Sequence, residues 1–187
     1  MKQYDSNYQT VFQDRPLGNN PYLHEKIKGG VWCVMCALSE LLSDLLEFHI
    51  YPLCLELLLM QLDGFVIRSK EYLEAGFTGD EVIWKSIEKI KLKDSRFEVE
   101  PDFSSKARDP NKILKFPAII SIDFSSKTGY QGHFLYAKKG RYFKDELVDF
   151  YVFDPYYDGW YWFKVKYGSI NKVYSIINIR KQDGNNG

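Results

Sequence analysis

The sequence predicts an α+β fold in which a helical part comes first and an antiparallel sheet follows. Residues 34–90 carry hydrophobic residues three and four positions apart, the spacing of helices. Residues 118–179 instead hold short runs of β-branched and aromatic residues, separated by Gly, Asp and Lys turns. Because helices and strands are segregated rather than alternating, the sequence favours an antiparallel sheet packed against the helical part.

Two helices are indicated first. One begins at or just after Cys33, and hydrophobic residues at helical spacing mark its buried face: Val34, Ala37, Leu38, Leu41, Leu42, Leu45 and Leu46. Pro52 suits the first turn of the second helix. Residues 53–62 are hydrophobic on nearly every side, which predicts a buried helix that ends at Asp63-Gly64.

A third helix is predicted by the capping-box pattern Thr78-x-x-Glu81, which precedes Ile83, Ile87 and Ile90 on one face. Beyond Pro110, strands are expected over residues 118–124, 133–137, 148–153, 160–166 and 173–179. We interpret the aromatic run at 156–163 as part of a hairpin whose alternate rings fill the core. A platform that stacks on a substrate is the alternative.

Size and composition bound the class of protein. The chain has 187 residues, 45% hydrophobic and 17% aromatic, enough for one domain with a buried core. We expect a single domain over residues 1–187, made of an N-terminal loop region (1–32), a helical lobe (33–110), an antiparallel β lobe (111–181) and a disordered tail (182–187).

Charge and hydropathy exclude several partners. The 25 Lys and Arg residues balance 25 Asp and Glu residues, so no net positive field favours nucleic acid. No stretch reaches the roughly 18 apolar residues that span a bilayer, and the first residues lack the apolar core of a signal peptide. We therefore expect a chain that is cytoplasmic as synthesised and not inserted in a membrane.

The cysteines are candidates for chemistry. Three of them, Cys33, Cys36 and Cys54, are an odd number at spacings that build no disulfide framework, so reduced thiols are expected. The pair Cys33-x-x-Cys36 also fits a redox module or half of a zinc site. No second CxxC or HxxxH completes a tetrahedral set, so we expect no metal and no cofactor.

Cys33 is the candidate nucleophile, because a helix N-terminus favours the thiolate through its unpaired N–H groups and positive dipole end. A packed core thiol is the alternative, and Cys36, one turn further, is interpreted as a small core residue.

A base is also needed. Of the three histidines, His133 follows Gly132 at a strand start and can project from a sheet end, whereas His24 lies in the N-terminal loop and His49 near the end of the first helix.

Asp154 completes the candidate site. It ends the strand 148–153 and precedes Pro155, about twenty residues and one hairpin after His133. If the two strands are antiparallel neighbours, the carboxylate and the imidazole meet at one sheet end. The carboxylate would then hold the ring in the productive tautomer and stabilise its cation. A simple Asp-Pro turn is the alternative.

These residues, in this order, resemble the papain-like cysteine peptidases, and specifically the bacteriocin-processing-peptidase-like group. The matching fragments cover most of residues 12–165: GGVWCVMCALSELL (29–42), YPLCLELLL (51–59), GDEVIWKSI (79–87), FPAIISI (116–122), GHFLYA (132–137) and VFDP (152–155). Several members also carry a Gln-Asp element near the N-terminus, which Gln13-Asp14 resembles. The chain departs from the family at Ile27, where many members place Gln, and at Val34-Met35, where Gly-Pro is usual.

The resemblance implies Cys33 as nucleophile, His133 as base and then acid, Asp154 as orienting carboxylate, and Gln13 as oxyanion donor. It implies a papain-like fold and a cysteine hydrolase acting on a peptide or protein, such as a processing peptidase or a phage or bacterial enzyme that cleaves peptidoglycan peptides. A virion-associated location fits the same group. The alternative is a catalytically degenerate papain-like domain with a structural role in a virion or a partner-binding role.

Overall fold

The computed structural model describes residues 32–66, 81–101, 115–123, 133–144, 146–155, 159–164 and 169–179. Within these ranges the elements run along the chain as α2 (Trp32–Leu46), α3 (Pro52–Gln61), β1 (Phe65–Val66), β2 (Glu81–Val82), the 3₁₀-helix η1 (Trp84–Lys89), β3 (Phe97–Pro101), β4 (Ala118–Asp123), β5 (His133–Phe143), β6 (Glu146–Phe153), β7 (Trp160–Lys164) and β8 (Ser169–Asn178).

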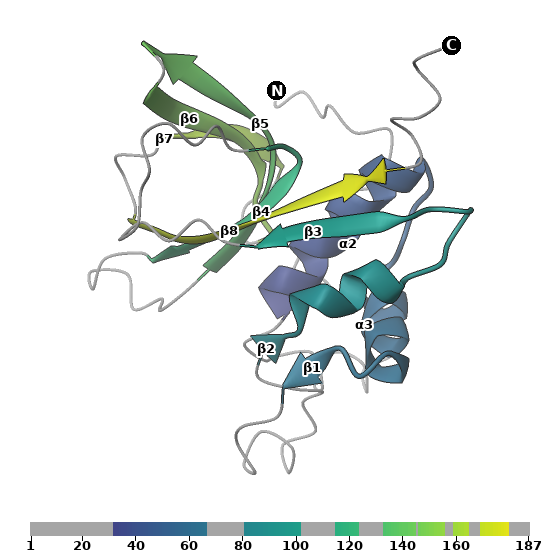
Figure 1. Ribbon diagram of the computed structural model, residues 1–187. Helices are drawn as coiled ribbons and strands as arrows, with labels where there is room; N and C mark the ends of the chain where they lie inside the picture. The colour runs from purple at the N-terminus through teal and green to yellow at the C-terminus, as the bar shows by residue number, and fades with distance from the viewer. Residues whose placement is uncertain are drawn as a thin grey trace, which may run out of the picture.

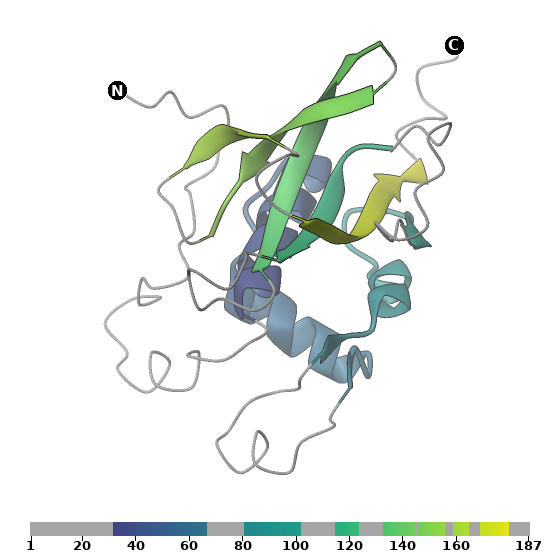
Figure 2. The same cartoon turned by 90° about the vertical axis from the view of Figure 1, so that its left-hand side faces the viewer.

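The main sheet has six strands in the order β3-β8-β4-β5-β6-β7, and every neighbouring pair is antiparallel. The sheet is strongly curved, and α2 lies against one of its faces, in contact with β4 and β5 (Figures 1 and 2). Strands β1 and β2 form a separate two-stranded ribbon beside α3. The predicted α+β class, with helices packed on an antiparallel sheet, is confirmed.

Strand alternation gives the sheet a hydrophobic core on each face. Toward the helices, Tyr136 and Phe153 join a cluster with the buried residues of α2 and α3. Toward the other face, Leu135 and Val152 join a second cluster built only from the sheet and its flanking residues. The predicted hairpin of aromatic residues follows the same rule in its described part, because Trp160 belongs to the first cluster and Phe163 to the second.

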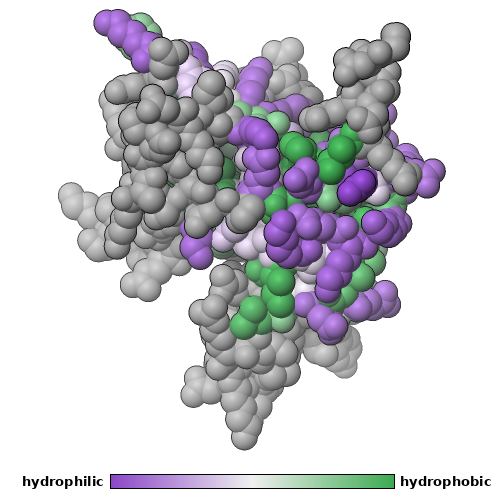
Figure 3. All heavy atoms as spheres, viewed as in Figure 1, coloured by the Kyte–Doolittle hydropathy of each residue, from purple (hydrophilic) through white to green (hydrophobic). Residues whose placement is uncertain are grey.

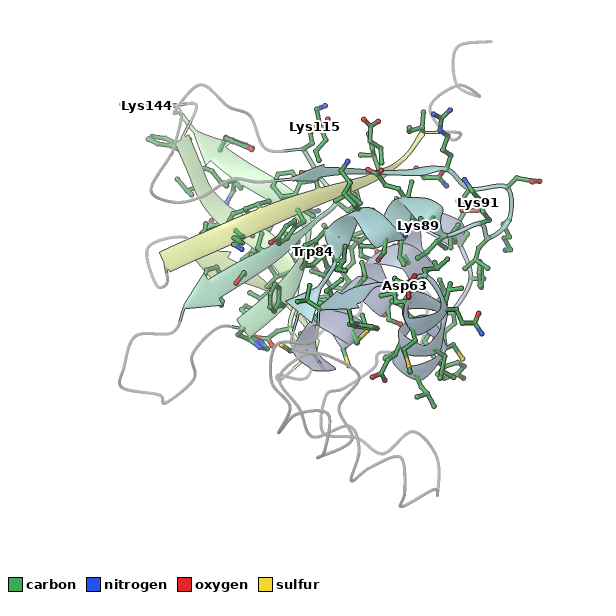
Figure 4. All side chains as sticks on the ribbon, turned by 60° about the horizontal axis from the view of Figure 1, so that its bottom comes forward. Asp63, Trp84, Lys89, Lys91, Lys115 and Lys144 are labelled. Atoms are coloured by element: carbon green, nitrogen blue, oxygen red, sulfur yellow. The ribbon has the colours of Figure 1, made fainter. Side chains whose placement is uncertain are left out.

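The predicted third helix is confirmed only in part, because it begins later than expected and is a 3₁₀-helix. Glu81 and Val82 form β2, and Val82 pairs with Phe65, so the residues expected in the first helical turn are extended. Only Trp84–Lys89 turns helical, as a 3₁₀-helix, while Thr78 lies outside the described residues. Trp84, labelled in Figure 4, anchors this segment. It stacks on Tyr174 of β8, with 3.8 Å between the ring centroids.

The sheet also begins earlier than predicted. Strand β3, within the expected helical lobe, pairs with β8 and forms one edge of the sheet. Its residues alternate, since Phe97 and Val99 are buried while Glu98 is exposed and Glu100 partly exposed. Hydrophilic side chains lie between the hydrophobic ones over β3, η1 and α3 (Figure 3).

Helix α3 has the predicted bounds but not the predicted burial. Leu55 and Leu59 are buried, whereas Leu57 and Met60 are about half exposed. The hydrophobic pattern has no period here, so the sequence does not show which side faces the core. The helix covers the first core with one side only.

Candidate active site

Helix α2 places Cys33 at the end of the sheet. Cys33 is the second residue of the helix, and the helix is held on β4 and β5 by fully buried residues such as Met35, Leu38 and Leu41. The first four N–H groups of a helix have no acceptor within it, so the thiol lies in a positive environment. Cys36 has no exposed surface, as expected for a small core residue.

The register of β5 and β6 brings His133 and Asp154 together. Tyr136 of β5 pairs with Phe153 of β6 in an antiparallel ladder. The start of β5 therefore lies beside the end of β6, as the sequence predicted. His133 Nε2 lies 2.6 Å from Asp154 Oδ1, and both side chains are buried. Because a carboxylate only accepts, the proton of this hydrogen bond belongs to Nε2.

His133 also interacts with Cys33, and this links the helix to the sheet. Burial acts most strongly on the pKa of His133 and lowers it. The hydrogen bonds and negative charges of Asp154 and Cys33 act the other way and together raise the pKa to about 9. With Nε2 held by Asp154, Nδ1 is the ring nitrogen left for the thiol. The site favours an imidazolium at neutral pH, the state that pairs with a thiolate.

Asp154 has a second partner that the sequence did not indicate. The hydroxyl of Tyr161 in β7 donates a hydrogen bond to Asp154 Oδ2 at 2.7 Å. Tyr161 lies on the strand next to β6, paired with Val152. It belongs to the aromatic run, where ring packing explains the composition, so no signal in the sequence separates it from Trp160 or Trp162.

The structure thus brings together Cys33, His133 and Asp154. Gln13, the fourth expected site residue, and His24 lie outside the described residues. His49 forms no hydrogen bond with the residues of this constellation: both of its ring nitrogens are buried without a hydrogen-bond partner among the described residues, and its ring packs edge-on against Tyr51. Burial lowers the pKa of His49, which favours its neutral form.

The sequence also raises the questions whether the cysteines are reduced and whether the protein has a metal site. Cys33, Cys36 and Cys54 are free thiols. In the described ranges, no three His, Cys, Asp or Glu side chains are grouped so that they could hold a metal ion. The helices of the described part are too short or too polar to cross a bilayer.

Comparisons with known proteins give no family. No protein-family model matches the chain, and no significant match exists among curated proteins or solved structures. Function must therefore be argued from the constellation itself.

Proposed function

We propose that this protein is a cysteine hydrolase with a papain-like arrangement, which cleaves a peptide or other amide bond through Cys33, His133 and Asp154. One observation carries the proposal. A single imidazole, buried at the end of the sheet, is held by a carboxylate at 2.6 Å and also interacts with a thiol at a helix N-terminus, which helps to raise its pKa. A nucleophile, a base and an orienting group in this order define nucleophilic acyl transfer.

The chemistry follows from these contacts. The Cys33 thiolate attacks the carbonyl carbon, and the carbonyl oxygen becomes an oxyanion. The N–H of Cys33 is one of the helix donors without an internal acceptor, and Gln13 is the side-chain donor that the family resemblance implies for the same oxyanion. The C–N bond then breaks, and the amine leaves with the proton of His133 Nδ1.

The second half regenerates the site. Neutral His133 takes a proton from water, which attacks the carbonyl carbon of the Cys33 thioester. The C–S bond breaks, the acid product leaves, and the thiolate and imidazolium are restored. Throughout, Asp154 stays on Nε2, so that Nδ1 remains directed at the sulfur and the substrate.

The substrate class rests on the resemblance to the bacteriocin-processing-peptidase-like group. The fragments from residue 29 to residue 155 that carry it include all three residues of the constellation. This supports a peptide or protein substrate in a bacterial or phage setting, either a precursor that is processed or the peptide part of peptidoglycan. No cofactor or metal is needed for this chemistry.

Selective alkylation tests the proposal. Native protein is treated with iodoacetamide from pH 5 to pH 10, and each cysteine is followed by mass spectrometry in the wild type and in His133→Ala. We expect Cys33 to react below pH 7 in the wild type only. Cys54 is an internal control, because it is an exposed thiol outside the site, and its labelling should be the same in the wild type and in His133→Ala.

The alternative, a catalytically silent papain-like domain with a structural or partner-binding role, is favoured by one observation. Cys33 is only 6% exposed, as a packed thiol would be. In that case Cys33 stays unlabelled until the protein unfolds, while Cys54 reacts normally. The same experiment therefore decides between the two functions.

A further inference from the structure

Both oxygens of the Asp154 carboxylate are engaged, and different strands supply the two donors. Oδ1 accepts from His133 Nε2 of β5 at 2.6 Å, and Oδ2 accepts from the Tyr161 hydroxyl of β7 at 2.7 Å. Strand β6 lies between them, and Asp154 follows it directly with no exposed surface. A buried carboxylate is stable only when strong donors replace water.

We propose that Tyr161 is a positioning residue, which fixes the Asp154 carboxylate in the orientation that holds His133. This inference rests on the proposed function and adds a fourth residue to its site. The carboxylate turns about the Cβ–Cγ bond, and a hydrogen bond on one oxygen alone leaves that torsion soft. A second donor on the other oxygen fixes the plane, so Oδ1 faces Nε2 continuously.

The hydroxyl can be separated from the ring. The Tyr161 ring packs, partly buried, against the core on the sheet face away from the helices. Phenylalanine at this position keeps that packing and removes only the donor. Tyr161→Phe should therefore fold, and its effect should pass through Asp154 to His133.

The chain offers a matched control. The Tyr136 hydroxyl donates to Asp44 Oδ2 at 2.7 Å, the same bond type and length between the sheet and α2. Tyr136→Phe loses an equivalent hydrogen bond to a carboxylate that does not contact His133. A general effect of losing such a bond on stability appears in both variants, whereas an effect on His133 appears only in Tyr161→Phe.

The titration of the His133 ring by NMR is the primary readout, because it does not need turnover. We expect its pKa to fall in Tyr161→Phe by about one unit, the scale of one weakened charge-assisted hydrogen bond, and to stay unchanged in Tyr136→Phe. In an Asp154→Ala background, adding Tyr161→Phe should produce no further shift.

A His133 titration in Tyr161→Phe that is unchanged or moves upward overturns the inference. So does a further shift in the Asp154→Ala background, because Tyr161 would then act by another route. Failure of the proposed function gives a different result, namely a wild-type Cys33 that is not labelled in the native state. The His133 titration still reports on Tyr161 in that case.

Discussion

At the scale of single residues, the site depends on two opposing effects at His133. Burial lowers the pKa of an imidazole, because the cation loses water, yet this ring is raised to about 9 because Asp154 and Cys33 supply negative charge on both sides. A buried histidine in a hydrophobic core would be neutral. The pairing with Asp154 and Cys33 is therefore what makes the ring fit for acid and base work.

Asp154→Asn should lower the hydrolysis rate by about 10³-fold or more, as expected when the orienting carboxylate of such a site loses its charge. The carboxylate now accepts from two donors, His133 Nε2 and the Tyr161 hydroxyl. An amide has one oxygen and one NH₂ group, so it can accept from only one of them. Rates measured at saturating and limiting substrate would show the loss. Near wild-type activity in the folded variant would contradict a role for Asp154.

Cys33→Ala should abolish turnover and leave the fold intact, whereas Cys36→Ala should retain activity and lose about 1 kcal/mol of unfolding free energy, because Cys36 is fully buried. The two variants remove the same group one helical turn apart. Turnover and urea denaturation measured on both separate chemistry from packing. If Cys36→Ala alone loses activity, Cys33 is not the nucleophile.

The three residues of the constellation could be predicted from the sequence because each is tied to an element boundary. Cys33 lies in the first turn of a helix with a clear hydrophobic face, His133 begins a strand, and Asp154 follows one. Tyr161 could not be predicted in this way. Its role depends on which strand neighbours β6 and on the direction of one hydroxyl, and an aromatic strand gives no hint of either.

At the scale of elements, periodicity located α2, α3 and five strands, and it failed where a tertiary contact overrides the local pattern. Val82 pairs with Phe65 in a two-stranded ribbon. Because of this pairing, the isoleucine spacing at 83–90 corresponds to a short 3₁₀-helix and not to an α-helix. The sequence does not predict strand β3, and the reason is different. Its alternation of Phe97 and Val99 with Glu98 and Glu100 is the pattern of a half-buried strand, but it stands apart from the other strands along the chain.

The end of α3 gives a prediction at this scale. Asp63 adopts a left-handed backbone with φ 53°, and the N–H of Gly64 donates to the carbonyl of Leu59 at 2.7 Å. A Cβ at Gly64 would lie 2.8 Å from that same main-chain oxygen, which cannot move without disturbing the helix. Gly64→Ala should cost about 1–3 kcal/mol of unfolding free energy, measured by urea denaturation.

Leu57→Ala is the control for Gly64→Ala, since Leu57 is 53% exposed on the same helix. It should change the unfolding free energy by no more than about 0.5 kcal/mol. Equal losses in the two variants would show that close packing at Gly64 does not determine how α3 ends.

At the scale of the whole molecule, the site exists only where the helix meets the sheet. Cys33 comes from α2, while His133 and Asp154 come from β5 and the end of β6. A second polar link holds the same two layers together. Asp44 of α2 accepts from the Tyr136 hydroxyl at 2.7 Å and pairs with Lys138 at 3.0 Å, both from β5. Anchored at both ends, α2 cannot slide along β5 without breaking one of the two contacts.

The charge of His133 predicts how the stability of the folded protein changes with pH. The pKa of His133 in the folded protein, about 9, lies above its ordinary value of 6.5, so the imidazolium binds its proton more tightly in the folded state. Its contribution to stability is therefore complete below pH 6.5 and is lost as the pH rises through 9.

Denaturation of the wild type and of His133→Ala, measured from pH 6 to pH 10, isolates this contribution as the difference between the two unfolding free energies. The difference should be largest near pH 6 and shrink toward pH 10. A difference that stays constant or grows with pH would mean that His133 is neutral in the folded protein, and the proposed thiolate–imidazolium pair would lose its physical basis.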